Sequence, residues 1–283
     1  MLTLTLTPDS PDFPSKLRNL PQVPDQLFVT DNFINLLDKP IVSIVGSRKL
    51  SPYGRQVTLQ LARELAQQGV VIMSGLAFGV DSVAHQGCLD AHGATIAVLP
   101  GPLDKIYPSS HRNLAEHIVT QGGALVSEYP RGTSVMKHQF IARNRLIAGL
   151  ADAVIITEAA EKSGSLHTAE FALEQGIPVF AVPGNITSVT SAGTNNLLRS
   201  GALMVTSTND VLSVLGIDTA APVKATSEDP AEQAILNLLQ EGVRDGTELL
   251  VGSQLDISVF NQSLTMLEIT GRVKALGGDQ WAL

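Results

Sequence analysis

The segment Gly46-Ser47-Arg48 has the residue types that bind phosphate, and it directly follows the apolar run Ile41–Val45. Free backbone N–H groups, a hydroxyl and a guanidinium can converge there on a phosphate oxygen. A tight turn that carries a surface arginine is the alternative. Because an unpaired arginine is costly at the end of a buried strand, the position favours phosphate contact.

A second segment interleaves cations with one aromatic ring. Its candidate binding residues are Lys137, Phe140, Arg143 and Asn144. Single-stranded nucleic acid needs both kinds of side chain, because cations attract its backbone while unpaired bases stack on rings. Spacing alone fits Phe140 to an ordinary core position equally well, since Ile141 and Leu146 also need a buried face.

A third segment follows another apolar run and opens a helix. Its candidate binding residues are Lys162, Ser163, Gly164 and Ser165. Short donors at the positive end of a helix suit an anion. A plain helix N-cap is the alternative, although capping would use only one of the two serines. Pro183-Gly184-Asn185 ends a later strand in the same style, and we expect it to close one wall of the same pocket.

Catalytic machinery is not predicted. The chain has no Gly-x4-Gly-Lys-Ser/Thr phosphate loop, and the glycine spacing in Ser74–Asp81 is wrong for a dinucleotide fingerprint. Asp81 and His85 lie four residues apart and could act as an acid–base or metal pair. Without a third ligand at suitable spacing, a structural hydrogen bond is favoured. We therefore expect a protein that is not an enzyme and has no metal or cofactor.

These segments must be positioned by an α/β fold. Short apolar runs alternate with amphipathic stretches that end in glycine, and helix Tyr53–Gln68 lies between the first two runs. Such strands predict a parallel sheet with helices on both faces, whose ligands bind beyond the carboxyl ends of the strands. The predicted strands are Ile41–Val45, Val70–Met73, Thr95–Leu99, Ala124–Val126, Ala153–Ile156 and Val179–Val182.

A second, smaller domain is expected at the carboxyl end. Residues 1–38 form a Pro-rich lead-in segment, 39–216 the α/β domain, 217–229 a linker and 230–283 the small domain. Ala231–Gln240 and Ser258–Thr270 are expected to be helical, and Arg272–Ala282 to form a closing hairpin. Helices followed by a terminal hairpin indicate a winged helix. The alternating Leu2–Leu6 resembles a strand without a predictable partner.

The net charge of −8 argues against a polyanion partner, but its distribution is uneven. Residues 129–151 contain four basic and no acidic side chains, whereas residues 218–283 contain ten acidic and four basic ones. The single Cys88 excludes an internal disulfide, and the Met1 end has no basic, apolar leader. No apolar run reaches the ~18 residues that a membrane span needs. A reduced, cytoplasmic location away from the membrane is expected.

Taken together, the loops resemble the DNA processing protein A family, DprA, also called Smf. The similarity runs from about Phe13 to the carboxyl end. Its most specific segments are Ile44–Arg48, Ser74–Ala77, Tyr107-Pro108, Ser127–Pro130, Arg143–Leu150, Ser163–Leu166 and Ala181–Gly184. The resemblance implies an extended Rossmann-like domain that forms a homodimer, binds single-stranded DNA in a basic pocket, and loads the RecA recombinase during natural transformation.

The resemblance has departures and a competitor. The family usually has a basic residue at Phe78, Asn at His111 and Pro at Ile141, and the loss of one cation should weaken DNA binding and its salt dependence. The acidic small domain is expected to contact proteins rather than DNA. The competing function is a phosphoribohydrolase acting on nucleoside monophosphates, with Glu170 as its carboxylate. The Pro-Gly-Gly-x-Gly-Thr run of those enzymes is missing here.

Overall fold

The structure, a computed structural model, describes residues 3–217, 227 and 229–283. The chain divides into two compact units, Met1–Asp218 and Thr219–Leu283. Most of the expected linker, 217–229, lies outside the described residues. Each unit has its own hydrophobic core, so each is described by itself.

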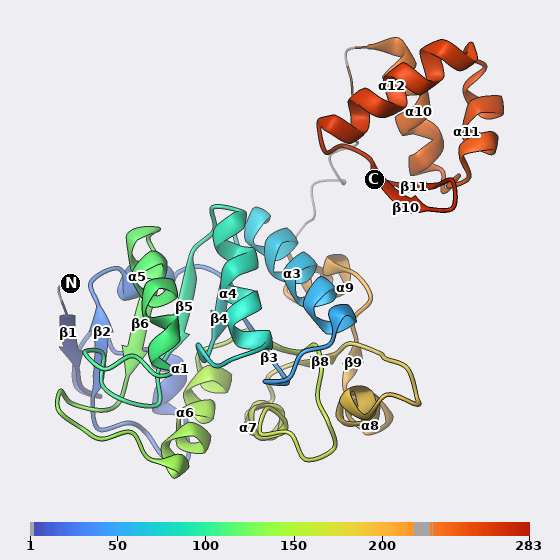
Figure 1. Cartoon of the computed structure of the whole chain (residues 1–283). Helices are drawn as coiled ribbons and strands as arrows, with labels where there is room; N and C mark the ends of the chain where they lie inside the picture. The colour runs from blue at the N-terminus through green and yellow to red at the C-terminus, as the bar shows by residue number, and fades with distance from the viewer. Residues whose placement is uncertain (1–2, 218–226, 228) are drawn as a thin grey trace. The chain divides into compact units, whose positions relative to one another are not determined.

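The first unit is built on a nine-stranded sheet in the order β1-β2-β6-β5-β4-β3-β7-β8-β9 (Figure 1). Strands β3 to β9 are parallel to one another, whereas β1 and β2 add to one edge in antiparallel pairing. The strands are β1 Thr3–Leu6, β2 Leu27–Thr30, β3 Ile41–Val45, β4 Val71–Ser74, β5 Thr95–Val98, β6 Ala124–Ser127, β7 Ala153–Ile156, β8 Val179–Ala181 and β9 Leu203–Met204. The six strands expected from apolar runs are all present, within one residue at either end.

Helices cover both faces of the sheet, as expected from strands that are apolar on both sides. Alternate residues of β3 enter different cores: Ile41 packs on the α6 and α7 face, and Val42 on the α3 and α4 face. The helices are α1 Ser15–Arg18, α2 Phe33–Leu36, α3 Pro52–Gln67, α4 Val80–Asp90, α5 Arg112–Thr120, α6 Lys137–Gly149, α7 Leu166–Glu174, α8 Ala192–Arg199 and α9 Thr208–Val214, with 3-10 turns at Ser109–His111 and Val189–Ser191.

The first 38 residues contribute structure to the main unit. The strand expected at the amino terminus is present as β1, and its partner is β2, which in turn pairs with β6. Phe13 and Leu17 are buried in the same core as α6. This segment therefore extends the sheet and the core, which is more than the lead-in role expected for it.

The second unit is a winged helix. Helices α10 Pro230–Gln240, α11 Gly246–Ser253 and α12 Ile257–Ile269 pack around a small core, and strands β10 Lys274–Gly277 and β11 Gln280–Ala282 form the hairpin. Helix α11 was not predicted from the sequence. Its first turn is capped by the Asp245 carboxylate, which accepts hydrogen bonds from the backbone N–H groups of Thr247 and Glu248.

Asp81 and His85 on α4 do not form the hydrogen bond expected between them. The Asp81 carboxylate accepts from the backbone N–H groups of Gly75 and Ala77, whereas Nδ1 of His85 lies 2.7 Å from the Thr95 hydroxyl. No cluster of three or more His, Cys, Asp and Glu side chains suited to a metal ion exists among the described residues. The two side chains therefore bond to different parts of the fold and not to each other.

His85 makes stability depend on pH. Burial is the main cause that lowers its pKa from 6.5 to about 3, so the folded state holds the ring neutral. Below pH 6.5 the His85 ring binds a proton in the unfolded chain but stays neutral in the folded chain. Stability is therefore lost as the pH falls toward 3. In urea titrations, the stability advantage of the wild type over His85→Asn should shrink by about 1.4 kcal/mol per pH unit below 6.5. The exposed His117→Asn is the control; an advantage that is constant between pH 7.5 and 5 would contradict the assignment.

Candidate nucleic-acid interface

Strands β4 to β6 are added on one side of β3, and β7 to β9 on its other side. The order in which the chain adds strands therefore switches between β3 and β7, which are parallel neighbours although distant in sequence. Open α/β sheets bind ligands at such a point, beyond the carboxyl ends of the strands. A cavity of about 800 Å³ lies there, and we call it the loop cavity. It is lined by Val45, Gly46, Ser47, Arg48, Lys49, Ala77, Asp81, Tyr107, Lys137, Phe140, Ile141, Arg143, Asn144, Ile147, Ala160, Ser163, Gly164, Ser165, Thr168, Val189 and Thr190.

The three segments singled out in the sequence meet at this cavity. The structure describes every candidate binding residue, and all but one of them line the loop cavity. The exception is Lys162, an exposed residue beside the lining residue Ser163. The cavity is thus formed mainly by the turns after β3 and β7 and by α6. The segments after β4, β5 and β8 also contribute lining residues.

A cation and two aromatic rings lie together in the cavity. The guanidinium carbon of Arg48 lies 5.2 Å from the ring centroid of Phe140. The ring of Tyr107 meets the ring of Phe140 edge-on, with centroids 5.3 Å apart. Phe140 is partly exposed, so the core position that its spacing also allowed is not the one it takes. The arrangement presents a flat apolar surface next to a positive charge, the pair of features that single-stranded nucleic acid uses.

The turn after β3 is held in place by Glu158. Its backbone carbonyl accepts from the N–H of Ser47 at 2.7 Å, and its buried carboxylate accepts from the N–H of Ser51 at 2.9 Å and from the Thr190 hydroxyl at 2.6 Å. Position 46 needs glycine, because a Cβ there would lie 2.7 Å from the Glu158 carbonyl oxygen. Glu158 therefore joins three separate loops behind the cavity.

Arg143 reaches the cavity but has a structural role. Its guanidinium is buried and donates to the carbonyl oxygens of Gly75, at 2.6 Å, and Val98, at the ends of β4 and β5. Burial is the main cause that lowers its pKa to about 10, so it stays charged. Burial also raises the pKa of Asp81, and Arg143 opposes that rise. These contacts give Arg143 a role in positioning the ends of β4 and β5, and its direct contact with DNA stays a prediction.

The α7 side of the cavity is polar. Ser163 and Ser165 share a hydrogen bond of 2.8 Å between their hydroxyls. The Ser165 side chain does not cap α7, whereas the Ser163 hydroxyl accepts from the N–H of Ser165 at 3.4 Å. The Asn144 amide donates to the carbonyl of Gly164 at 3.2 Å, which fixes this loop to α6. One of the two serines thus makes a capping-type contact, and both hydroxyls lie at the positive end of a helix.

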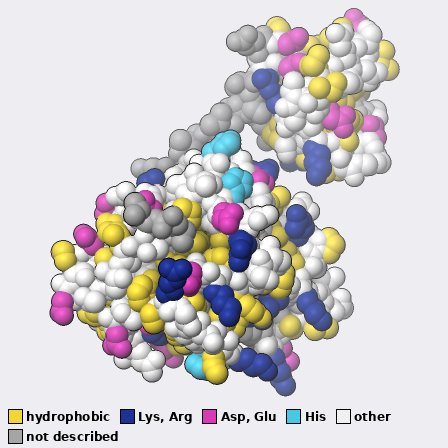
Figure 2. All heavy atoms as spheres, turned by 60° about the vertical axis from the view of Figure 1, so that its left-hand side comes forward, with side chains coloured by type: hydrophobic (Ala, Val, Ile, Leu, Met, Phe, Trp, Pro, Cys, Tyr) yellow, Lys and Arg dark blue, Asp and Glu magenta, His cyan; other side chains and the backbone are white. Residues whose placement is uncertain are grey.

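Most of the positive charge counted in residues 129–151 is engaged within the protein. Arg131 pairs with Asp104 at 3.0 Å, Arg145 pairs with Glu128, and Arg143 is buried. Lys137 is exposed and lines the loop cavity. On the face drawn in Figure 2, basic and acidic side chains lie scattered among hydrophobic ones. The charge available to a phosphate therefore comes mainly from Arg48, Lys49 and Lys137, a smaller patch than the sequence suggested.

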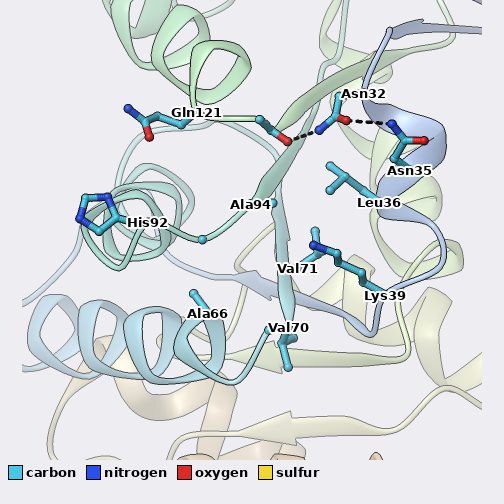
Figure 3. Close-up of a pocket in the computed structure, with 13 residues that line it drawn as sticks. Asn32, Asn35, Leu36, Lys39, Ala66, Val70, Val71, His92, Ala94 and Gln121 are labelled. Carbon is cyan, nitrogen blue, oxygen red and sulfur yellow. Dashed lines mark hydrogen bonds between the residues drawn. The ribbon is translucent and has the colours of Figure 1, made fainter.

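Two other cavities lie outside this group of residues. Pro183, Gly184 and Asn185 line a separate hollow of about 430 Å³ with Tyr53 and Glu158, so they do not form the wall expected of them. A cavity of about 440 Å³ lies before the amino ends of β3 to β6, and its lining includes Lys39 and His92 (Figure 3). Parallel sheets seldom use that end for binding. The loop cavity is the best candidate site.

Glu170, the carboxylate expected of a phosphoribohydrolase, lies outside the loop cavity. Its exposed side chain pairs with Nδ1 of His167 at 2.9 Å. Asp81 is the only carboxylate among the lining residues described, and backbone N–H groups and the nearby Arg143 hold it in place. The positions of these groups give no support to the hydrolase.

Sequence reasoning missed several lining residues. Lys49 directly follows Arg48, and two consecutive basic residues after a strand could have indicated that both bind phosphate. Tyr107 was noted only as part of a Tyr-Pro pair, which the structure places next to Phe140 with a cis peptide bond to Pro108. Thr190 had no signal at all, since its place depends on the long-range contact with Glu158.

Comparison with known protein families covers both units. A family model for DNA recombination-mediator protein A matches residues 4–226, and one for the DprA winged helix domain matches residues 219–279. Protein Smf of Escherichia coli is 42% identical over 207 residues, which are 73% of this chain and 55% of that protein. DNA processing protein DprA of Bacillus subtilis is 38% identical over 211 residues, 75% of this chain and 71% of that protein. The chain spans from 54% to 71% of the length of the curated relatives it matches.

Solved structures agree. DNA processing protein A from Streptococcus pneumoniae matches with a TM-score of 0.70 and 39% identity over 74% of this chain and 73% of that one. DNA processing protein A from Helicobacter pylori was solved for its single-stranded DNA binding mode. It matches with a TM-score of 0.68 and 37% identity over 75% of this chain and 95% of that one. Because the family match extends over nearly the whole nine-stranded sheet, and the winged helix has its own match, this chain belongs to the DNA recombination-mediator protein A family, also called DprA or Smf.

Proposed function

We propose that this chain binds single-stranded DNA in the loop cavity and delivers it to the RecA recombinase, without catalysing a reaction itself. The observation that carries the proposal is the convergence of Arg48 and Phe140, from segments far apart in the sequence, at the switch point of the sheet. Membership of the recombination-mediator family and the single-stranded DNA binding of the Helicobacter pylori relative support it.

In this proposal the cavity residues divide the work by chemistry. Arg48, Lys49 and Lys137 neutralise phosphates, and the N–H groups and hydroxyls around Gly46, Ser47, Ser163, Gly164 and Ser165 donate to phosphate oxygens. Phe140 stacks on a base. Arg143 and Asn144 position the loops, and Lys162 adds charge from outside the cavity.

Stacking explains the preference for an unpaired strand. A base inside a duplex has both of its faces covered by neighbouring bases, so it cannot stack on Phe140 without being extruded. The duplex can use only the cations of the cavity. These are few, because most of the basic side chains in residues 129–151 are ion-paired or buried. We therefore expect single-stranded DNA to bind much more tightly than duplex.

Fluorescence anisotropy of the full chain tests the function. Labelled oligo-dT and a matched duplex are titrated at several salt concentrations. We expect tight binding of oligo-dT, and its logarithmic salt dependence should have a slope of about −0.7 for each phosphate neutralised. Equal affinity for the duplex, or no binding of oligo-dT at low salt, would contradict the proposal.

Partners and location are proposals that rest on the family resemblance. We propose a homodimer in the cytoplasm that binds RecA, with the winged helix contacting proteins because that part of the chain is acidic. No helix in the described part of the chain has the length and apolar character to cross a membrane. Sedimentation of the chain alone, and RecA filament assembly on oligo-dT with and without it, test the two partner assignments.

A further inference from the structure

A second pair of aromatic rings lies outside the lining of the loop cavity. Phe78 and His111 meet edge-on, with ring centroids 4.8 Å apart and an interplanar angle of 69°. The Phe78 side chain is 50% exposed, a large fraction for a phenylalanine. Nδ1 of His111 lies 2.9 Å from the carbonyl oxygen of Leu76, and this contact fixes the plane of the histidine ring. The His111 ring therefore supports one edge of the exposed Phe78 ring.

The backbone places this ring pair next to Arg48. The residue after Phe78, Gly79, has a φ of +79°, and a Cβ there would lie 2.2 Å from the Ser47 carbonyl oxygen. The next N–H, that of Val80, donates to the same oxygen at 3.1 Å. The turn that carries Phe78 therefore lies directly against the turn that carries Arg48, and the preceding residue, Ala77, lines the loop cavity.

A second connection runs through the loop after β5. His111 belongs to the 3-10 turn Ser109–His111, and Tyr107 lies just before this turn. Tyr107 meets Phe140 inside the cavity, whereas His111 meets Phe78 outside it. One short loop therefore contributes a ring to each pair.

The two loops next to the ring pair are rich in basic residues. Arg48 and Lys49 precede it on the neighbouring turn, and Lys105 and Arg112 lie on its own loop. All four are exposed, and within residues 3–217 none of them forms an ion pair. The acidic residue of this loop, Asp104, is paired with Arg131. A flat apolar face beside unpaired cations suits a base attached to a phosphate chain.

We propose that Phe78 and His111 form a second stacking platform, over which single-stranded DNA continues after it leaves the loop cavity. This inference rests on the proposed function and extends its binding site. The strand would follow the carboxyl edge of the sheet from the turn after β3, past the turn after β4, to the loop after β5. Phe78 supplies the exposed face for a base, and His111 supports the Phe78 ring from its edge.

The test measures the affinity of full-chain variants for a series of oligo-dT lengths. Phe78→Ala should weaken the binding of long oligomers on the order of ten-fold, because one stacked base is lost. The shortest oligomers that still bind should be unaffected, and the salt slope should stay the same because no charge is removed. Phe78→Arg exchanges the ring for a cation and should steepen the salt slope by about 0.7. Leu173→Ala, which removes a similarly exposed apolar side chain from α7, is the matched control.

Phe78→Leu separates stacking from packing, because leucine keeps apolar bulk but has no flat face. Wild-type affinity of Phe78→Leu or Phe78→Ala for long oligomers would overturn the second platform. An equal loss at every length would also overturn it, because a platform outside the loop cavity cannot affect a strand short enough to stay within the cavity. If the wild type fails to bind oligo-dT, or if Arg48→Ala and Phe140→Ala bind normally, the proposed function itself fails.

Discussion

Replacing Arg143 with alanine should lower the free energy of unfolding of the first unit by about 3–5 kcal/mol. The substitution removes the donor that Arg143 supplies to the buried carbonyl groups of Gly75 and Val98, and it removes the positive charge near the buried Asp81. In a unit of this size the midpoint of thermal unfolding should fall on the order of 10 °C. Arg143→Lys should recover only part of the loss, because one ammonium cannot reproduce the planar guanidinium.

The measurement has an internal control. Unfolding of the first unit is followed in urea by its tyrosines, all of which lie there, while the single Trp281 reports on the winged helix. The tryptophan transition should not move in Arg143→Ala. The matched control is Arg131→Ala, whose side chain is 87% exposed, and it should change stability by less than about 0.5 kcal/mol. A stable Arg143→Ala protein with weakened DNA binding would restore the direct DNA contact that the sequence suggested.

The second large effect is expected on DNA binding. Arg48→Ala and Phe140→Ala should each weaken oligo-dT binding about ten-fold, one through a lost phosphate contact and the other through a lost stacked base. The two losses should differ in kind: the salt slope should become shallower by about 0.7 in Arg48→Ala and should stay unchanged in Phe140→Ala. Duplex binding should suffer less than oligo-dT binding in Phe140→Ala.

The double variant tests whether the two side chains act together. Because the Arg48 guanidinium lies 5.2 Å from the Phe140 ring centroid, each side chain helps to position the other. The combined loss should therefore be smaller than the product of the single losses. The matched control is Arg18→Ala, which removes an arginine whose guanidinium carbon lies 6.0 Å from the Phe13 ring, outside the loop cavity. Simple multiplication of the two losses would show that the ring and the cation bind DNA independently.

The sheet could be predicted from the sequence because its signals are local. Apolar runs such as Ala153–Ile156 stand between helices and glycines, and a strand that is apolar on both faces belongs to a covered parallel sheet. The same pattern places the strand ends and their loops, so it also predicts that the loop segments of the candidate site meet. Helix α11 was missed because Gly246–Ser253 is short and has a glycine inside it, although Asp245 before it was an N-cap signal.

The roles of individual cations could not be predicted, because they depend on contacts between distant segments. Arg143 meets Gly75, 68 residues away, and Arg145 meets Glu128 from another loop. The sequence places these arginines on one helix with Phe140, but it does not say which of them faces the interior. The pairing of β1 with β2 is hidden for the same reason, since alternation predicts a strand without naming its partner.

Photocrosslinking tests the central claim most directly. Oligo-dT carrying 5-iodouracil is bound to the full chain and irradiated, and the modified peptides are mapped by mass spectrometry. The adducts should fall on the peptides that contain Phe140 and Tyr107, and Phe140→Ala should remove the first. Adducts confined to the winged helix, or to the cavity lined by Lys39 and His92, would contradict a binding site at the carboxyl edge of the sheet.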